Sequence, residues 1–433
     1  MNITHIKKRN GSLQEYDIKK IATAVRRALA ATGEGTTDET AEIVATRVHA
    51  NVLQFCSDAS AEGNVQCVDG QPTVEEIQDL VERSLMELGH YETAKAYILF
   101  RSEKDKARTP DIFKKRQNLK PYEYPDLYEY VSAIRHSYWI HTEFNYTSDI
   151  QDFMVNVTPV EREVIKRAML AISQMEVAVK NFWGDLHHKL PKPEIGSVGA
   201  TFAESEVRHA DAYAHLLEIL GLNADFERIL DVPVLKERYN YLSETAAVGK
   251  TDDQREYTKS IILFSLLIEH ASLFSQFLII MSFNKHRNIF KGISNVVEAT
   301  SKEEQIHGMF GIDLIGVIRA EHPEWFDITT TNDIEEFCKG AFSVEERVVD
   351  WIFETGELDF LSKATVKEFI KNRLNNSIEA IGFPRSFAVD EKLVAETEWF
   401  DNEVIATKHV DFFQKRSINY NKRSQSITGN DLF

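Results

Sequence analysis

Cysteine and positive charge are both scarce in this sequence. Three cysteines occur in 433 residues, at Cys56, Cys67 and Cys338, and their spacing matches neither a disulfide framework nor a zinc knuckle. A reducing cytoplasm is therefore the expected compartment. The 50 Lys and Arg residues are outnumbered by 68 Asp and Glu, which gives a formal net charge of -18. This balance disfavours a nucleic-acid binder, because affinity for a polyanion comes from basic side chains.

Long uncharged apolar runs are also missing. The N-terminus lacks the apolar core of a signal peptide, and no apolar run is expected to span a bilayer. The longest, residues 260–283, carries Glu269 and His270 at its middle. We therefore expect no membrane association.

The first part of the chain, residues 1–103, is expected to form a small α+β domain. Two short extended runs meet at Asn10-Gly11, a dipeptide that favours a tight hairpin turn. Asp17 is placed to cap a helix that ends at Gly33. The remaining segments are expected to be a helix near residues 38–55, a loop over 56–72 and two further helices.

The rest of the chain is expected to be mainly α-helical. Residues 104–126 are rich in charge and proline and are interpreted as a linker. Helical periodicity then continues over residues 127–400, which predicts a helical bundle. Residues 401–433 are expected to form a flexible polar tail.

Two Glu-x-x-His motifs stand out in the bundle region. Glu206 and His209 lie in "ESEVRHADAY", and Glu304 and His307 lie in "EEQIHGM". Residues three apart share a helix face, so each pair presents a carboxylate and an imidazole to one point. A single pair is more often an exposed salt-bridging face. Two pairs in apolar helices instead indicate a ferritin-like di-metal bundle, which needs one more carboxylate from each of two further helices.

Glu176 and Glu269 are the candidates for those further carboxylates. Glu176 falls on the buried stripe of the helix expected over residues 162–186, and Glu269 lies in the most apolar segment of the chain. An unpaired ionised carboxylate there would be costly. The alternative for Glu269 is pairing with Lys or Arg, but its helix neighbours offer no cation except His270.

Four carboxylates and two imidazoles suit two first-row ions such as iron or manganese. We expect three residues to hold each ion, with carboxylates bridging between them. One set is Glu176, Glu206 and His209, and the other is Glu269, Glu304 and His307.

With these motifs in place, residues 135–420 resemble the small, radical-generating β subunit of class I ribonucleotide reductases. That family's ligand order is a carboxylate, Glu-x-x-His, Glu and Glu-x-x-His, as it is here. The resemblance implies a mainly α, ferritin-like bundle holding di-manganese, di-iron or a mixed pair. It also implies a homodimer and a large (α) subunit that reduces ribonucleotides to deoxyribonucleotides.

The resemblance also implies roles for individual residues. Tyr213, four residues after the first ligand histidine, would be the radical site. Trp139, in "SYWIHTEFNYTSD", would be the near end of an electron-transfer path that runs through Glu303 to His209. Tyr420, in the tail, would be the far relay, and the terminal "NDLF" would dock on the large subunit.

Two departures from the family pattern leave questions open. The first ligand and the relay acid are usually Asp, but they are Glu176 and Glu303 here. The metal's identity therefore stays open, as does whether Tyr213 or the metal pair stores the oxidising equivalent. An alternative for Tyr213 is a core aromatic residue whose hydroxyl bonds a ligand carboxylate.

The motif "HIKKRNG" resembles the opening of an ATP-cone. The resemblance implies that Lys8, Arg9 and Lys20 contact a triphosphate, with Lys95 in "ETAKAYILFR" as a further basic position. Basic side chains at a hairpin tip beside a helix N-terminus favour an anion site, although such a run is also usual on a solvated surface. A cone on a β subunit implies that ATP and dATP act as allosteric effectors, with larger oligomers in dATP.

Two other functions remain as alternatives. One is a ferritin-like di-metal oxidase or metal-storage protein with a nucleotide-sensing domain. The outward path from the metals argues against it. The other is a nucleotide-sensing interaction protein whose bundle has lost its metal, and the complete ligand set argues against that.

Overall fold

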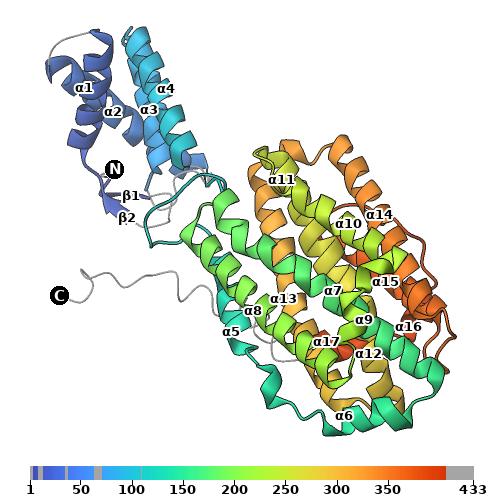
Figure 1. Ribbon diagram of the computed structural model, residues 1–433. Helices are drawn as coiled ribbons and strands as arrows, with labels where there is room; N and C mark the ends of the chain where they lie inside the picture. The colour runs from blue at the N-terminus through green and yellow to red at the C-terminus, as the bar shows by residue number, and fades with distance from the viewer. Residues whose placement is uncertain (1–2, 8–12, 35–37, 63–70, 109, 406–433) are drawn as a thin grey trace. The chain divides into compact units, whose positions relative to one another are not determined.

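The chain divides into two compact units, residues 1–110 and 111–433 (Figure 1). The computed structural model describes residues 3–7, 13–34, 38–62, 71–108 and 110–405. Some residues singled out by the sequence lie outside these ranges: Lys8, Arg9, Asn10, Gly11, Tyr420 and the terminal "NDLF".

In its described residues, the N-terminal unit is a two-stranded sheet followed by four helices (Figure 1). Strands β1 (His5–Lys7) and β2 (Leu13–Glu15) pair antiparallel, with Ile6 opposite Gln14. The helices pack around a small core of aliphatic side chains that includes Val25, Val48 and Leu85. They are α1 (Ile18–Thr32), α2 (Asp38–Glu62), α3 (Val74–Glu87) and α4 (Tyr91–Arg108).

Local signals set the ends of α1 as predicted. The Asp17 side chain accepts a hydrogen bond from the backbone N–H of Lys19, and Gly33 adopts a left-handed φ of 71° at the C-terminus. The prediction for α2 was too short, because this helix continues through Glu62 into the expected loop.

The expected linker over residues 104–126 differs from what the structure contains. Helix α4 continues through Arg108. Beyond it, Ile112, Phe113 and Tyr124 are buried in the core of the second unit. Tyr124 also donates a 2.6 Å hydrogen bond from its hydroxyl to Glu321. These apolar side chains attach the segment to the bundle.

The second unit is a bundle of long helices that run side by side (Figure 1). The long helices are α7 (Pro159–Lys189), α8 (Pro193–Ile219), α10 (Pro233–Val248), α12 (Leu273–Arg287), α13 (Lys291–Glu321), α14 (Ile328–Ile352) and α15 (Lys363–Ala380). The shorter elements are α5 (Pro125–His136), η2 (His141–Glu143), α6 (Thr147–Gln151), η3 (Asp152–Asn156), α9 (Asn223–Glu227), η4 (Ile229–Asp231), α11 (Gln254–Ile261), η5 (Ile262–Ser272), η6 (Pro323–Trp325), α16 (Glu391–Ala395) and α17 (Glu398–Ile405).

Polar side chains fix where the functional helices begin. At the start of α7, Thr158 and Glu161 form a reciprocal capping box. At the start of α13, Asp149 of α6 accepts hydrogen bonds from the backbone N–H groups of Gly292 and Ile293, at 3.1 and 2.8 Å. The helix that carries the second Glu-x-x-His is therefore anchored at its N-terminus by a buried acid.

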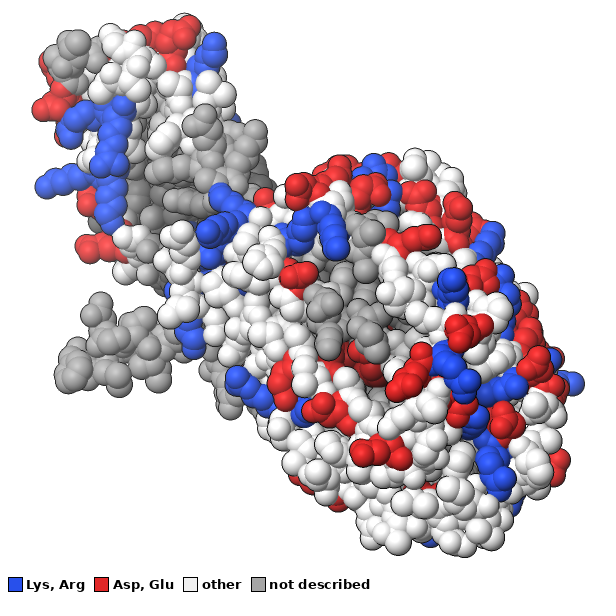
Figure 2. Space-filling view, viewed as in Figure 1, with Lys and Arg blue, Asp and Glu red and all other residues white. Residues whose placement is uncertain are grey.

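The most apolar stretch lies in the centre of the bundle. Its middle part, η5, is π-helical and carries Glu269, and π segments often mark functional sites in longer helices. By length and composition alone, Gln254–Arg287 does pass as a membrane-spanning helix, contrary to the sequence-based expectation. Its most apolar window is 100% buried inside the protein, as core helices of soluble proteins are. The visible face of the bundle mixes acidic and basic side chains (Figure 2).

Candidate metal centre

Six side chains from four helical segments meet inside the bundle. α7 and η5 contribute one carboxylate each, and α8 and α13 contribute one Glu-x-x-His pair each. All six are at most 2% exposed. They are Glu176, Glu206, His209, Glu269, Glu304 and His307. The structure thus brings together all of the residues that the sequence indicated as metal ligands.

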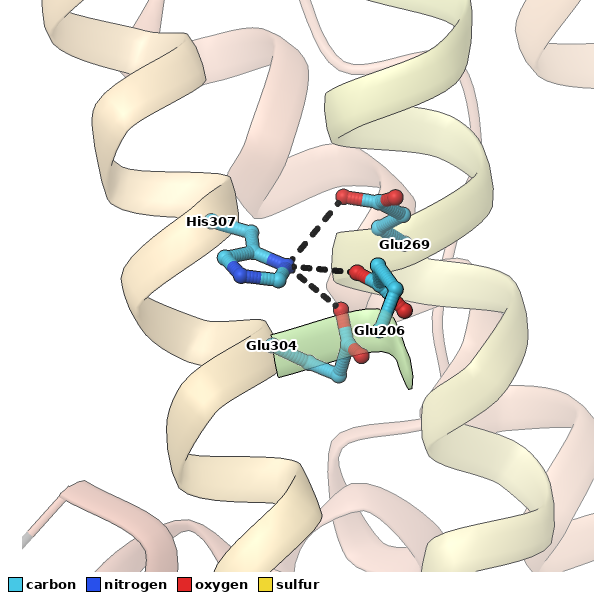
Figure 3. A group of neighbouring side chains, drawn as sticks. All are labelled: Glu206, Glu269, Glu304 and His307. Atoms are coloured by element: carbon cyan, nitrogen blue, oxygen red, sulfur yellow. Dashed lines mark hydrogen bonds and ion pairs between the residues drawn. The ribbon is translucent and has the colours of Figure 1, made fainter. Parts of the chain in front are cut away.

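His307 points one ring nitrogen at three carboxylates (Figure 3). Its Nδ1 lies 3.1 Å from Glu206, 3.1 Å from Glu304 and 3.6 Å from Glu269. Its Nε2 lies 3.1 Å from the Ser205 hydroxyl, which itself donates to the carbonyl of Phe202. Because that hydroxyl proton is already used, Ser205 accepts from Nε2–H, and Nδ1 is left to the carboxylates. A metal-ligating histidine has this arrangement.

His209 is oriented in the same way. Its Nδ1 lies 3.0 Å from Glu304 and 3.5 Å from Glu206, whereas its Nε2 lies 2.8 Å from Glu303. An ionised carboxylate only accepts hydrogen bonds, so Nε2 carries the ring proton and donates it in a hydrogen bond to Glu303. Both imidazoles therefore direct Nδ1 into the same cluster of acids.

The six residues form two overlapping groups that could each hold an ion. In one, Glu176, His209 and Glu304 have ligand atoms within 4.8 Å of one another. The other contains Glu206, Glu269, Glu304 and His307. This grouping differs from the sequence-based partition, because Glu206 falls with His307 and Glu304 belongs to both groups. Glu304 is therefore the carboxylate best placed to bridge two ions.

The unsatisfied atoms of the cluster are those that a cation would bind. In the described part of the structure, both oxygens of Glu176, both of Glu206, Oε1 of Glu304 and Nδ1 of His209 have no hydrogen-bond partner. Buried polar atoms rarely stay unpaired. When all four carboxylates are ionised they carry four negative charges, which two divalent ions would neutralise. The donor set therefore fits a di-metal centre.

The pKa shifts agree with this charge argument. Burial, reinforced by the neighbouring carboxylates, raises the pKa of Glu176 and that of Glu269 well above the usual range. Burial also opposes the charged form of Glu206, but contacts with His209 and His307 lower its pKa to about 2. The cluster therefore favours nearby positive charge, which a metal ion would supply.

Glu303 lies next to the centre and connects it to Trp139. It accepts hydrogen bonds from His209 Nε2 at 2.8 Å and from the Trp139 indole N–H at 3.1 Å. The Trp139 ring is also stacked on His209, with 5.9 Å between centroids. The Arg208 guanidinium donates to both Glu303 oxygens at 3.1 Å. Trp139, Glu303 and His209, the near part of the expected electron-transfer path, therefore make a continuous chain of contacts.

Tyr213 is buried near the first group of ligands. Its side chain is 1% exposed, and its hydroxyl lies beside the Thr300 side chain and makes no hydrogen bond to a ligand carboxylate. Burial, followed by the nearby Glu176 charge, raises the pKa of the phenol well above its usual range. The hydroxyl bond to a ligand carboxylate, considered above as an alternative, is therefore not seen in the described structure.

Two residues of the centre were missed by sequence analysis. Trp183 of α7, which is 0% exposed, donates its indole N–H to Glu269 at 2.9 Å. Arg208 of α8 provides the cation that holds Glu303. Arg208 precedes the ligand His209 directly, so its position was a usable signal. No such signal marked Trp183 in the sequence, because an aromatic residue on an apolar helix face usually belongs to the hydrophobic core.

The two described candidates for the triphosphate site, Lys20 on α1 and Lys95 on α4, lie near opposite ends of α1. Lys20 and Lys95 are both exposed. Near Lys95, the Thr93 hydroxyl lies 2.9 Å from that of Thr32, in the last turn of α1. Lys20 lies in the first turn of this helix, about 18 Å earlier along its axis at 1.5 Å per residue. In this unit, Lys and Arg side chains gather along one edge of the visible face (Figure 2).

Comparison with known proteins identifies both units. Residues 116–393 match the family model "Ribonucleotide reductase, small chain", and residues 4–106 match the "ATP cone domain" model. A probable ribonucleoside-diphosphate reductase small subunit of Invertebrate iridescent virus 3 is 22% identical over 329 residues, which cover 72% of this chain and 86% of that protein. The ribonucleoside-diphosphate reductase subunit alpha of Chlamydia muridarum is 35% identical over 103 residues, which cover 23% of this chain and 9% of that protein.

The fold comparison agrees with the family match. The dimanganese(II) protein NrdF of Streptococcus sanguinis superposes with a TM-score of 0.56 at 13% identity, over 67% of this chain and 100% of that chain. This likeness confirms the predicted mainly α, ferritin-like bundle. Because the small-chain model spans more than half of the sequence, the chain belongs to the ribonucleotide reductase small-chain family and carries an N-terminal ATP cone.

Proposed function

We propose that this chain generates and stores the oxidising equivalent used by a class I ribonucleotide reductase. As a small subunit it has a large subunit as partner. We propose that the equivalent passes to that partner, which reduces ribonucleotides to deoxyribonucleotides. The observation that carries this proposal is the contact chain from His209 through Glu303 to Trp139. A self-contained oxidase or a storage protein has no need of such a relay.

The six ligands would hold two transition-metal ions. When bound, these ions would supply a one-electron oxidant in a site from which water is excluded. Carboxylates and imidazoles suit iron and manganese alike, so di-iron, di-manganese and mixed pairs are the candidates. Elemental analysis combined with low-temperature electron paramagnetic resonance (EPR) of the activated protein distinguishes the three.

We propose that the metal pair, with Tyr213 as a neighbour, stores the oxidising equivalent. Oxidation of a phenol also removes its proton, and neither oxygen of the nearby Glu176 carboxylate accepts a hydrogen bond from the Tyr213 hydroxyl. Burial and the Glu176 charge further oppose loss of that proton. We expect Tyr213→Phe to keep the EPR signal of the activated protein. Loss of a narrow radical signal in this variant would instead assign the store to Tyr213.

The relay is tested by replacing its tryptophan. With a matched large subunit, Trp139→Phe should abolish deoxynucleotide formation while metal content and the activated EPR signal remain. Trp325→Phe is the control, because Trp325 stacks on His322 in a different part of the bundle. Undiminished activity in Trp139→Phe would remove the main support for the proposal and favour the oxidase or storage alternatives.

We propose that the ATP cone senses ATP and dATP and controls how small subunits associate. Lys8, Arg9, Lys20 and Lys95 are the proposed phosphate contacts, and Tyr420 with the terminal "NDLF" the proposed contact with the large subunit. The association state is proposed to be a homodimer that forms larger oligomers in dATP, in the cytoplasm. Titration with dATP while the mass is followed by light scattering tests this. An unchanged mass at saturating dATP would contradict it.

A further inference from the structure

A cavity of roughly 790 Å³ leads from the surface of the bundle to one side of the metal centre. It lies among α7, α8, α9 and η2. At its inner end it is lined by the buried Glu176 and Tyr213, and at its outer end by the exposed Asp211 and Glu218. Glu176 is the only one of the six ligands among its lining residues. The cavity therefore reaches the centre through one ligand.

The side chains of the cavity favour a positively charged solute. Asp211 and Glu218 place two carboxylates at its outer end. The imidazoles of His141 and His215 also line the cavity, with 5.1 Å between ring centroids. None of the residues that line the cavity is Lys or Arg. A cleft lined by one sign of charge concentrates ions of the opposite sign and speeds their arrival.

The inner end of the cavity supplies a second, independent observation. Glu176 is 2% exposed, and neither of its carboxylate oxygens has a hydrogen-bond partner in the described structure. Desolvation without a partner is unfavourable for a carboxylate. An ion arriving through the cavity would therefore meet an unsatisfied acid before it met any other ligand.

We propose that this cavity is the route by which divalent cations enter the metal centre. Glu176 and His209 would be the first ligands to hold an entering cation, and Glu304, which belongs to both groups, would connect that position to Glu206, Glu269 and His307. Both ions would enter by this route, so the position near Glu176 would fill last. This inference depends on the proposed metal centre, which the experiment tests separately.

The first test removes charge from the outer end of the cavity. The double variant Asp211→Asn/Glu218→Gln should take up Mn²⁺ about three- to tenfold more slowly than the unaltered protein at low ionic strength. Uptake is followed as loss of the EPR signal of free Mn²⁺ after rapid mixing. Added salt should slow the unaltered protein but leave the variant nearly unchanged. The control, Glu336→Gln/Glu391→Gln, removes two exposed charges elsewhere in the bundle.

The second test obstructs the cavity. Ala214 lines it from α8 and is exposed, so Ala214→Trp adds bulk without entering the core. Uptake of both ions should slow by about tenfold or more, because entry then requires local opening of the bundle. The final number of ions bound should not change. The control is Ala200→Trp, at an exposed position of α8 that does not line the cavity.

The outcomes separate this inference from the function on which it depends. Normal uptake rates in both variants overturn the entry route, even if two ions bind at equilibrium. Slow uptake in Ala214→Trp with a normal rate in the charge variant overturns the role of the acids. Failure of the unaltered protein to bind two ions at equilibrium instead contradicts the proposed metal centre.

Discussion

The buried acid Glu345 has an arginine partner inside the bundle, whereas the ligand carboxylates of the metal centre have none among the described residues. Glu345 lies 2.9 Å from the Arg238 guanidinium, which is 0% exposed and also donates to Gln276 at 3.0 Å. Among the described ion pairs of the metal centre, the acids Glu206, Glu269 and Glu304 pair only with histidine. The Arg238–Glu345 pair is therefore complete as folded, whereas the metal centre requires positive charge from solution.

The pKa shifts express the same difference. Burial raises the pKa of Glu345, but the Arg238 charge opposes that shift. At Glu269, burial is joined by repulsion from Glu206 and Glu304. From the sequence alone, Glu269 could pair with a Lys or Arg side chain or bind a metal ion. Glu345, which pairs with Arg238, is an example of the first alternative in this protein. The comparison teaches that a buried acid indicates a metal site only when its neighbours are also acids.

The largest change in stability should come from breaking the Arg238–Glu345 ion pair. Arg238→Met leaves Glu345 buried without its cation, and loss of one partner of a buried pair costs about 3–5 kcal/mol. The free energy of unfolding should fall by that amount with or without bound metal. Urea unfolding followed by circular dichroism measures it.

The matched control removes both partners of this pair. Arg238→Met/Glu345→Leu should recover most of the lost stability, because two apolar side chains can replace a buried ion pair at little cost. A double variant as unstable as Arg238→Met would show that packing of the Arg238 side chain dominates, rather than the unpaired charge.

A smaller free-energy change is expected at the centre of the metal site. Glu304→Ala removes the one acid common to both ion groups, so affinity for both ions should fall by at least about 100-fold, or about 2.7 kcal/mol. Isothermal titration with Mn²⁺ measures this change. Glu345→Gln is the control and should bind both ions normally. Loss of a single ion in Glu304→Ala would argue against a bridging role.

The ligands could be predicted from the sequence because helix geometry fixes residues three apart on one face. That rule alone placed Glu206 with His209, and Glu304 with His307. It could not place Trp183 on Glu269, because this contact joins residues 86 positions apart and depends on how α7 packs against η5. The same limit applies to the division of ligands between the two ions, since the position of Glu206 depends on the relative position of α8 and α13.

The contact of Trp183 should contribute less than a ligand does. Its indole N–H holds the Glu269 carboxylate in place, and loss of such an outer partner typically weakens metal binding by 10-fold or more. Trp183→Phe should therefore lower Mn²⁺ affinity by about tenfold, or about 1.4 kcal/mol. The control is Trp325→Phe. An unchanged affinity would make Trp183 a packing residue alone.

The smallest expected change is in the free energy of unfolding of Glu269→Gln, and its sign should reverse when metal binds. Burial raises the pKa of Glu269 well above its usual range, so in the metal-free protein at neutral pH this acid favours the unfolded state, where it ionises freely in water. Glu269→Gln removes that penalty and should raise metal-free stability. With Mn²⁺ bound, the same variant should be less stable than the unaltered protein, because it has lost a ligand.

The control, Glu345→Gln, should lower stability both with and without Mn²⁺, since its partner Arg238 remains buried. Thermal unfolding of the two variants with and without Mn²⁺ measures these four differences, and a metal-free loss of stability in Glu269→Gln would mean that Glu269 is already satisfied without an ion.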